Sequence, residues 1–371
     1  MDGQQRVHAS SACQGIRPAV VVGAVVLAVA VCGCSRWAQG HSGASGRTHE
    51  TGTRGSSALQ PTGALYVLDT SSGKATELVE PGCPVGRPSW SPDGARIAYV
   101  PADADHRSRE LVLADPSGAQ PSERLSVPDV EMGQVEWSPD GRWLACRGSV
   151  PGDDRGRIVL VTPSGLPGPS VALEWRPSYV FWYPGSDRLL LGLALRLYSW
   201  RVGDEVPRRL TEGEHDESMA TVSPAGDAVA LLRGKGDVLQ LWVVEGEGGR
   251  ERQITRIPRG CLLIWPSWSP DGSRLAFGAI GSSGAPSVFS VKTDCSDLRQ
   301  LTDGSHQVRN VAWSPGGGLV AYVAERQGQW DLWLMNSDGT GQVQVTCNPE
   351  REGIAGWSPD GSKLLVLQAE P

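Results

Sequence analysis

The phrase Trp90-Ser91-Pro92-Asp93-Gly94 decides the fold of this 371-residue chain, because it returns along most of its length. Intact copies begin at Trp90, Trp137, Trp268 and Trp357, a looser copy begins at Trp313, and two decayed copies begin at Trp182 and Val222. Successive copies stand 40 to 47 residues apart. Seven copies at such a period predict a propeller or a solenoid built from four-stranded units.

Each copy reads as the turn of a β-hairpin. Proline presets φ for the second position of a β-turn, and aspartate and glycine suit the positions that follow, where glycine can take a positive φ. Apolar alternation follows the turn, as in Ile97-Ala98-Tyr99 and Leu275-Ala276-Phe277. The tryptophan before the turn is large and flat, and we expect it to pack between neighbouring sheets.

A second hairpin completes each unit, as in Asp331–Thr340 and Ile158–Gly165. The seventh such hairpin, Ala64–Gly73, precedes the first phrase, and the chain stops at Pro371, just after the last phrase hairpin. One hairpin is therefore left over at each end. Joined in one blade, they would close the ring and remove exposed sheet edges. The fold class predicted is all-β, a seven-bladed β-propeller over residues 63–371 closed by the N-terminal and C-terminal hairpins.

The repeated phrase, followed by (Ile/Leu)-Ala-(Phe/Tyr) and by a second strand ending in a glycine turn, resembles the TolB-type, WD40-like propeller repeat. The resemblance covers residues 63–370 and implies the propeller fold. The TolB family itself has six blades in the periplasm, an α/β domain before them and no lipobox. This chain has a short polar segment in that place, so membership of the Tol–Pal envelope system is only an alternative.

Residues 1–33 are predicted to be a lipoprotein signal peptide. Arg6 and Arg17 precede the apolar run Ala19–Val31, whose length of roughly 20 Å as a helix is short of the roughly 30 Å hydrocarbon core of a bilayer. The run ends in Val31-Cys32-Gly33-Cys34, which resembles a bacterial lipobox with Cys34 as the lipidated residue. An ordinary cleaved signal or a short membrane anchor are the alternatives. Residues 34–62 are rich in Gly, Ser, Thr and Gln, as in a flexible tether with a reach on the order of 30 Å.

Composition and motifs exclude several functions. The net charge is −7, and the sequence contains no run of Lys or Arg that could form a concentrated positive surface. We therefore expect no nucleic-acid partner. The sequence contains no Gly-x-Ser-x-Gly elbow, His-Glu-x-x-His helix, phosphate loop or dinucleotide fingerprint. We therefore predict a protein that is not an enzyme and needs no cofactor.

One weak set of candidate metal ligands remains at the predicted mouth of the channel. Seven residues before the phrases stand Cys83, His215, Cys261, His306 and Glu350, residue types that can bind a metal. Positions across a propeller face can be well over 10 Å apart, whereas zinc needs ligands at about 2.0–2.3 Å. We therefore predict no metal site, and keep a lyase or hydrolase at the channel mouth as the alternative. The aspartates of the phrase are explained by turn chemistry.

Export would permit disulfides, and two pairs are candidates: Cys83 with Cys347, and Cys261 with Cys295. These four cysteines are expected in loops or turns. Cys146 follows a phrase hairpin and is expected on a strand, buried.

The predicted function is that of a non-catalytic scaffold, anchored to a bacterial membrane through lipid and held outside the cytoplasm. It would bind an envelope protein or a glycan as a monomer, through loops that no motif singles out.

Overall fold

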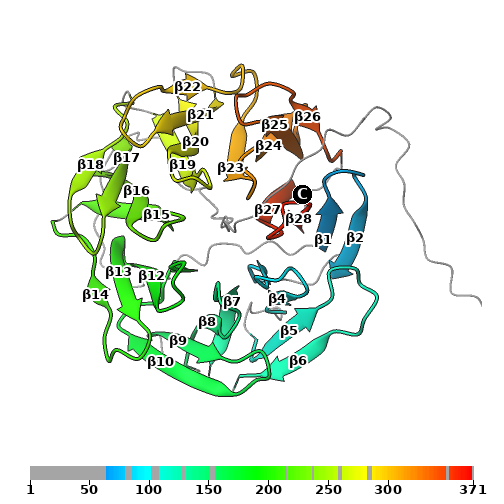
Figure 1. Cartoon of the computed structure of the whole chain (residues 1–371), viewed down its shortest axis with the longest axis vertical. Helices are drawn as coiled ribbons and strands as arrows, with labels where there is room; N and C mark the ends of the chain where they lie inside the picture. Colours follow the sequence, from blue (N-terminus) through cyan, green and yellow to red (C-terminus); the bar gives the residue numbers. More distant parts are fainter. Residues whose placement is uncertain are drawn as a thin grey trace, which may run out of the picture.

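The computed structural model describes residues 64–79, 86–101, 108–127, 130–150, 155–213, 215–235, 238–257, 261–281, 286–347 and 351–369. These residues form 28 strands in seven four-stranded antiparallel sheets. The sheets stand as blades around a central axis (Figure 1). The predicted all-β, seven-bladed propeller is confirmed. The signal-peptide, lipidation and tether predictions, with Cys34, fall outside the described residues.

The blades are numbered in chain order, with the innermost strand first in each. Blade 1 contains β3 (Ser89–Trp90), β4 (Ile97–Tyr99), β5 (Glu110–Ala114) and β6 (Glu123–Ser126). Blade 2 contains β7 (Glu131–Trp137), β8 (Leu144–Ser149), β9 (Gly156–Val161) and β10 (Pro167–Leu173). Blade 3 contains β11 (Tyr179–Trp182), β12 (Arg188–Leu193), β13 (Arg196–Arg201) and β14 (Arg208–Arg209). Blade 4 contains β15 (Asp216–Val222), β16 (Ala228–Lys235), β17 (Val238–Glu245) and β18 (Glu251–Gln253).

The remaining blades follow the same plan. Blade 5 contains β19 (Cys261–Trp268), β20 (Arg274–Gly281), β21 (Ser287–Lys292) and β22 (Arg299–Gln300). Blade 6 contains β23 (Val308–Trp313), β24 (Leu319–Arg326), β25 (Gln329–Asn336) and β26 (Val343–Gln344). Blade 7 contains β27 (Arg351–Trp357), β28 (Lys363–Ala369), β1 (Leu65–Asp69) and β2 (Ala75–Val79).

Blade 7 closes the ring with both ends of the propeller. Its strand order is β2-β1-β28-β27, and β1 runs antiparallel to β28, with Tyr66 opposite Val366 and Asp69 opposite Lys363. The predicted sharing of one blade by the two terminal hairpins is therefore confirmed. The pairing gives β1 and β28 a neighbour on both sides, which removes two sheet edges.

The repeated phrase forms the turn that the sequence predicts. In blade 1 the Gly94 amide donates to the Ser91 carbonyl at 2.9 Å, and Gly94 has a φ of 70°. In the decayed copy of blade 3, Ser186 occupies the glycine position and keeps a φ of 57°. The turn geometry is thus retained where the sequence has drifted, at a steric cost that glycine would not incur.

The phrase tryptophans lie between blades, as predicted. All six are buried, and Trp357 is completely inaccessible to solvent. Three of them donate their indole Nε1–H to a main-chain carbonyl of the preceding blade at 3.2–3.3 Å. The donor and acceptor pairs are Trp182 to Glu136, Trp268 to Thr221, and Trp357 to Ala312. Each such residue joins two blades by apolar packing and by a hydrogen bond.

The cysteine predictions have mixed outcomes. Cys146 is buried on β8, as predicted. The pairing of Cys261 with Cys295 is wrong, because Cys295 is free and the two lie at opposite ends of blade 5. Cys261, which opens β19 rather than lying in a loop, faces Gly281. Cys295 follows Lys292, which faces Arg274, and the β20 segment from Arg274 to Gly281 spans about 23 Å. Cys83 falls outside the described residues, so its pairing with Cys347 stays a prediction.

Candidate functional site

The residues predicted as metal candidates lie at the starts of three consecutive inner strands. His215 is exposed just before β15, and its carbonyl accepts a hydrogen bond from Arg196 Nη1 at 2.6 Å. His306 is half-buried before β23, and Cys261 opens β19. Glu350 falls outside the described residues. Within the part of the chain that is described, no three His, Cys, Asp or Glu residues are grouped closely enough to hold a metal ion.

The phrase aspartates are engaged within their own turns. Asp93 Oδ1 accepts hydrogen bonds from Ser91 Oγ at 2.5 Å and from the Ala95 amide at 2.9 Å. These bonds, that from Ser91 above all, hold the pKa of the Asp93 carboxyl below its usual value. Asp271 and Asp360 repeat the arrangement with Ser269 and Ser358. The interpretation as turn residues accounts for all of these contacts.

The phrase turns interlock around one face of the ring, here called the turn face. A Cβ added to Gly141 would lie 3.3 Å from Pro92 of the preceding blade, and one on Gly226 would lie 3.2 Å from Pro184. Gly94, Gly317 and Gly361 approach a preceding proline at 3.5–3.6 Å in the same way. Proline-on-glycine contact therefore joins neighbouring turns at five of the blade junctions, and it makes the turn face a preorganised surface.

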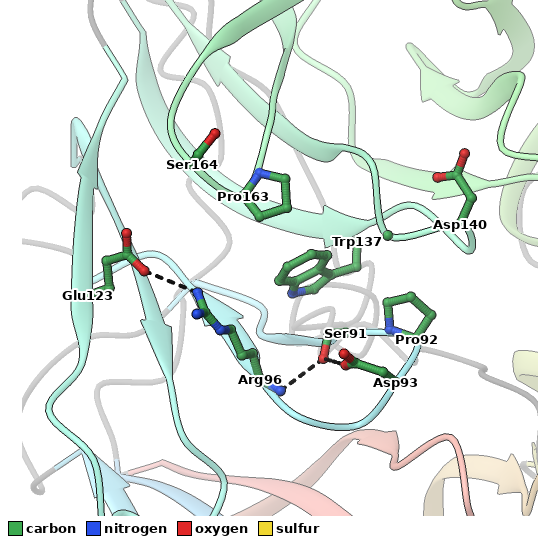
Figure 2. A pocket seen from close by; sticks show the side chains of 10 residues that line it. Ser91, Pro92, Asp93, Arg96, Glu123, Trp137, Asp140, Pro163 and Ser164 are labelled. Atoms are coloured by element: carbon green, nitrogen blue, oxygen red, sulfur yellow. Dashed lines mark hydrogen bonds and ion pairs between the residues drawn. The ribbon is translucent and has the colours of Figure 1, made fainter.

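A pocket of about 610 Å³ opens between the turns of blades 1 and 2 (Figure 2). The turn residues of both blades line its floor, the Arg96–Glu123 ion pair lines one wall, and the β9–β10 turn lines the other. The lining residues are Ser91, Pro92, Asp93, Arg96, Glu123, Trp137, Asp140, Gly141, Pro163 and Ser164. The two charged groups of the ion pair lie 3.0 Å apart and are half exposed. The pocket thus offers an aromatic edge, two prolines and charged groups of both signs.

A second feature involves the residue that stands three positions before each phrase, in or beside the innermost strand of its blade. We call these residues the inner ring: Arg87, Gln134, Tyr179, Met219, Trp265, Asn310 and Ile354. Irregular pairing interrupts the inner strands at or beside this position in blades 2, 4, 5, 6 and 7. Such bulges turn side chains out of the regular alternation of a strand.

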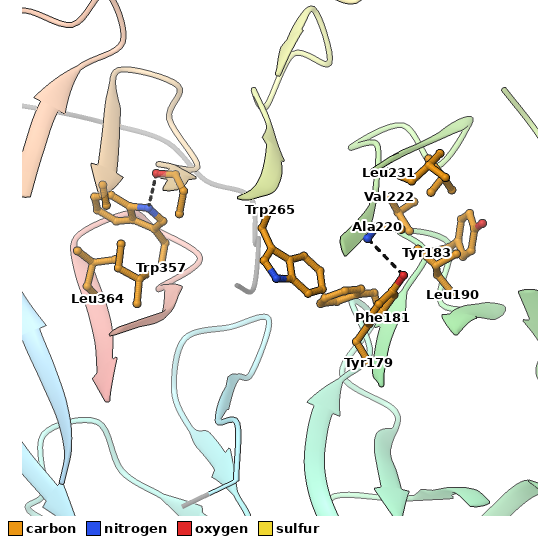
Figure 3. Close-up of a cluster of buried hydrophobic side chains, with 14 of the residues drawn as sticks. Tyr179, Phe181, Tyr183, Leu190, Ala220, Val222, Leu231, Trp265, Trp357 and Leu364 are labelled. Atoms are coloured by element: carbon orange, nitrogen blue, oxygen red, sulfur yellow. Dashed lines mark hydrogen bonds between the residues drawn. The ribbon is translucent and has the colours of Figure 1, made fainter. Parts of the chain in front are cut away.

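The inner ring fills part of the channel with aromatic side chains. Trp265 of blade 5 lies 5.2 Å from Tyr179 and 5.9 Å from Phe181 of blade 3, measured between ring centroids. Blade 4 stands between these two blades in chain order, so the contact crosses the channel (Figure 3). The Tyr179 hydroxyl accepts a hydrogen bond from the Ala220 amide at 3.3 Å, which fixes that ring against blade 4.

Two ionisable groups lie beside this cluster. The Arg87 guanidinium lies over the Phe181 ring, with its Cζ 4.9 Å from the ring centroid, a contact between blades 1 and 3. Burial lowers the pKa of Arg87 to about 10 and raises the pKa of Glu136 to about 7, although each charge partly stabilises the other. The sequence interpretation missed the inner ring. The available signal was the fixed offset of three residues from the phrase.

No helix among the described residues is long and apolar enough to cross a bilayer. The fold defines the class of this protein: it is a seven-bladed β-propeller with interlocked turns on one face and a partly filled channel. Residues 259–371 match the family of the TolB beta propeller domain. Together with the repeats, this match shows that the propeller is similar to the TolB beta propeller domain.

Two relatives show how far the sequence similarity extends. An uncharacterized protein of Agrobacterium fabrum is 25% identical over 220 residues, which cover 57% of this chain and 68% of the relative. The Tol-Pal system protein TolB of an Anaeromyxobacter species (strain K) is 30% identical over 182 residues, which cover 44% of this chain and 40% of that protein. The similarity therefore spans less than half of the length of TolB.

Solved structures share the fold at low identity. The putative TolB from Agrobacterium tumefaciens has a TM-score of 0.52 and 17% identity, over 83% of this chain and 98% of that one. An oligogalacturonate lyase in complex with manganese has a TM-score of 0.57 and 15% identity, over 84% of this chain and 97% of the lyase. At such identities the likeness establishes the propeller architecture, which is shared by proteins with unrelated functions.

Proposed function

We propose that this chain is a TolB-like binding module of the bacterial cell envelope that holds a partner protein or a glycan and performs no chemistry. The observation that carries the proposal is the turn face, where proline-on-glycine contacts preorganise a pocket between blades 1 and 2. A rigid surface loses little conformational freedom on binding, so more of the contact energy remains as affinity. The similarity to the Tol-Pal system protein TolB supports an envelope location.

The pocket has the composition of a binding site for a polar partner. Trp137 and two prolines supply apolar contact, while along one wall Arg96 supplies hydrogen-bond donors and Glu123 supplies acceptors. Tryptophan and arginine are enriched among the residues that dominate binding energy. We further propose that residues 1–33 direct export, that lipid on Cys34 anchors the chain, and that residues 34–62 hold the monomeric propeller near the membrane.

The test is crosslinking and affinity capture of the tagged full chain from its native membranes. The informative variant is Ser164→Arg, which places a long side chain at the pocket wall. The matched control is Ser117→Arg, because Asp115-Pro116-Ser117-Gly118 is the same turn in blade 1 as Thr162-Pro163-Ser164-Gly165 in blade 2, and Ser117 lines no part of the pocket.

We expect one envelope partner to be recovered with the original chain and with Ser117→Arg, and to fall at least tenfold with Ser164→Arg. A version that keeps residues 1–62 and lacks the propeller should recover none. Equal recovery with both arginine variants would remove the pocket from the proposal. Recovery by the anchor segment alone would remove the propeller.

A further inference from the structure

We propose that the centre of the channel is a binding site for a small carboxylic acid with an apolar or aromatic body, held by Arg87 and Trp265 of the inner ring. This site is separate from the pocket on the turn face. The inference begins with Arg87, whose Nε, Nη1 and Nη2 atoms are all buried without a hydrogen-bond partner. Among the arginines of the described residues, Arg87 is the one whose three side-chain nitrogens are all buried without a hydrogen-bond partner.

A buried guanidinium normally finds partners, because leaving it unpaired is strongly destabilising. Other arginines beside the inner strands do so: Arg233 pairs with Glu217 at 2.8 Å, and Arg309 donates to the Glu352 carbonyl at 2.7 Å. Arg87 instead has the face of Phe181 at 4.9 Å. The phenyl ring supplies no in-plane acceptor, so the guanidinium N–H donors stay without partners, and their fork geometry matches a carboxylate.

A second unpartnered donor lies on the same aromatic cluster. Trp265 is 93% buried, since its exposed fraction is 7%, and its Nε1–H has no acceptor. Its ring is 5.9 Å from that of Phe181, the residue over which the Arg87 guanidinium lies. Four buried N–H-bearing nitrogens from two residues of the inner ring therefore border one aromatic side chain. Donors without acceptors favour an anionic ligand that supplies the acceptors.

The charges of the neighbourhood select a monoanion. Glu136 is the carboxylate whose charge acts on Arg87, while Arg147 adds a second positive charge. Glu136 would repel a dianion such as phosphate more strongly than a carboxylate. Phe181, Tyr179 and Trp265 provide apolar surface for the body of the acid. Arg87 as a residue is partly exposed although its nitrogens are buried, so we expect entry through rotation of its side chain.

The test uses the purified full chain and 4-fluorobenzoate, whose ¹⁹F resonance reports binding. We expect saturable one-to-one binding, at least tenfold weaker affinity in Arg87→Gln, and no competition from an equal concentration of inorganic phosphate. Arg309→Gln is the matched control, since it removes an inner-strand arginine that also lies over an aromatic ring, that of Trp330, at 4.2 Å. Its affinity should stay within twofold of the original chain.

Should Arg87→Gln fail to fold by near-ultraviolet circular dichroism, Trp265→Phe removes the N–H and keeps an aromatic ring, with an expected loss of threefold or more. Absence of binding to the original chain would overturn the proposal. So would unchanged affinity in the folded variant, or equal competition by phosphate.

Discussion

Single residues in this propeller show how burial changes the chemistry of an ionisable group. Glu136 is the residue of β7 immediately before Trp137, and 9% of its surface is exposed. Its carboxyl loses water on folding and gains incomplete compensation from Arg87, so its pKa rises to about 7. An acid whose pKa is higher in the folded state binds protons more tightly there, so the folded state is favoured at low pH.

This gives a prediction for stability against pH. Glu136 ionises near its usual pKa of 4.5 when unfolded and near 7 when folded, so its ionisation should progressively lower the free energy of unfolding as pH rises between these values. The total loss is on the order of 3 kcal/mol. Glu136→Gln should remove this loss. The variant should therefore have a higher free energy of unfolding than the original chain at pH 8, and the difference between the two should be smaller at pH 4.5. Urea denaturation at the two pH values measures it, and an unchanged pH profile in the variant would contradict the assignment.

The phrase aspartates give a second prediction at this scale. Asp271→Ala should lower stability by about 1 kcal/mol, because it removes the acceptor that Ser269 and the Ser273 amide use. Asp271→Asn keeps a side-chain oxygen and should lose much less. Addition of calcium or of a chelator should leave the melting temperature of the original chain unchanged. A calcium-dependent shift that Asp271→Ala abolishes would show that the turn interpretation is incomplete.

Among the elements, the hairpins were the most predictable part, because their turns are fixed by local chemistry. Pro92, Asp93 and Gly94 specify their turn without help from distant residues. The inner ring was not predictable in the same way. Its residues share no chemistry, and bulges beside Met219 and Asn310 depend on pairing between strands. The loop assignment of Cys261 failed for a related reason, since β19 extends to that residue only by pairing with Gly281 of β20.

The β12–β13 hairpin carries a turn that its sequence does not favour. Ala194 and Leu195 both have positive φ, 46° and 58°, and Leu193 pairs with Arg196, so the loop has two residues. Glycine or asparagine normally fills such positions. Leu195→Gly should raise the free energy of unfolding by about 1 kcal/mol, and it also removes a leucine that is more than half exposed.

The corresponding two-residue turn of β24–β25, Gln327-Gly328, already has glycine at its second position, with a φ of 84°. Gly328→Leu should therefore destabilise by a similar amount, about 1 kcal/mol. Thermal and urea denaturation of both variants measure the pair. Changes of the same sign would show that the backbone conformation does not govern these two positions.

At the scale of the whole molecule, the closed ring couples all the blades. Leu275 and Leu364 occupy the same position of the repeat, each opposite its phrase tryptophan and fully buried. One lies in blade 5, made from continuous chain, and the other in blade 7, made from both ends. Apart from this difference in chain connectivity, the two sites are matched.

We expect Leu275→Ala and Leu364→Ala each to cost about 2–5 kcal/mol, and each to shift one cooperative transition. Calorimetry together with circular dichroism checks both expectations. An additional early transition in Leu364→Ala alone would mean that blade 7 opens independently of the other blades.

The pairing of β1 with β28 also sets an order of events during biosynthesis. β1 is among the first parts of the propeller to leave the ribosome, yet its inner neighbour consists of Lys363–Ala369, among the last. The ring therefore cannot close until the last strand of the propeller has been made. Threading through a membrane pore requires an open chain, so under the export proposed above the ring would close only on the far side of the membrane.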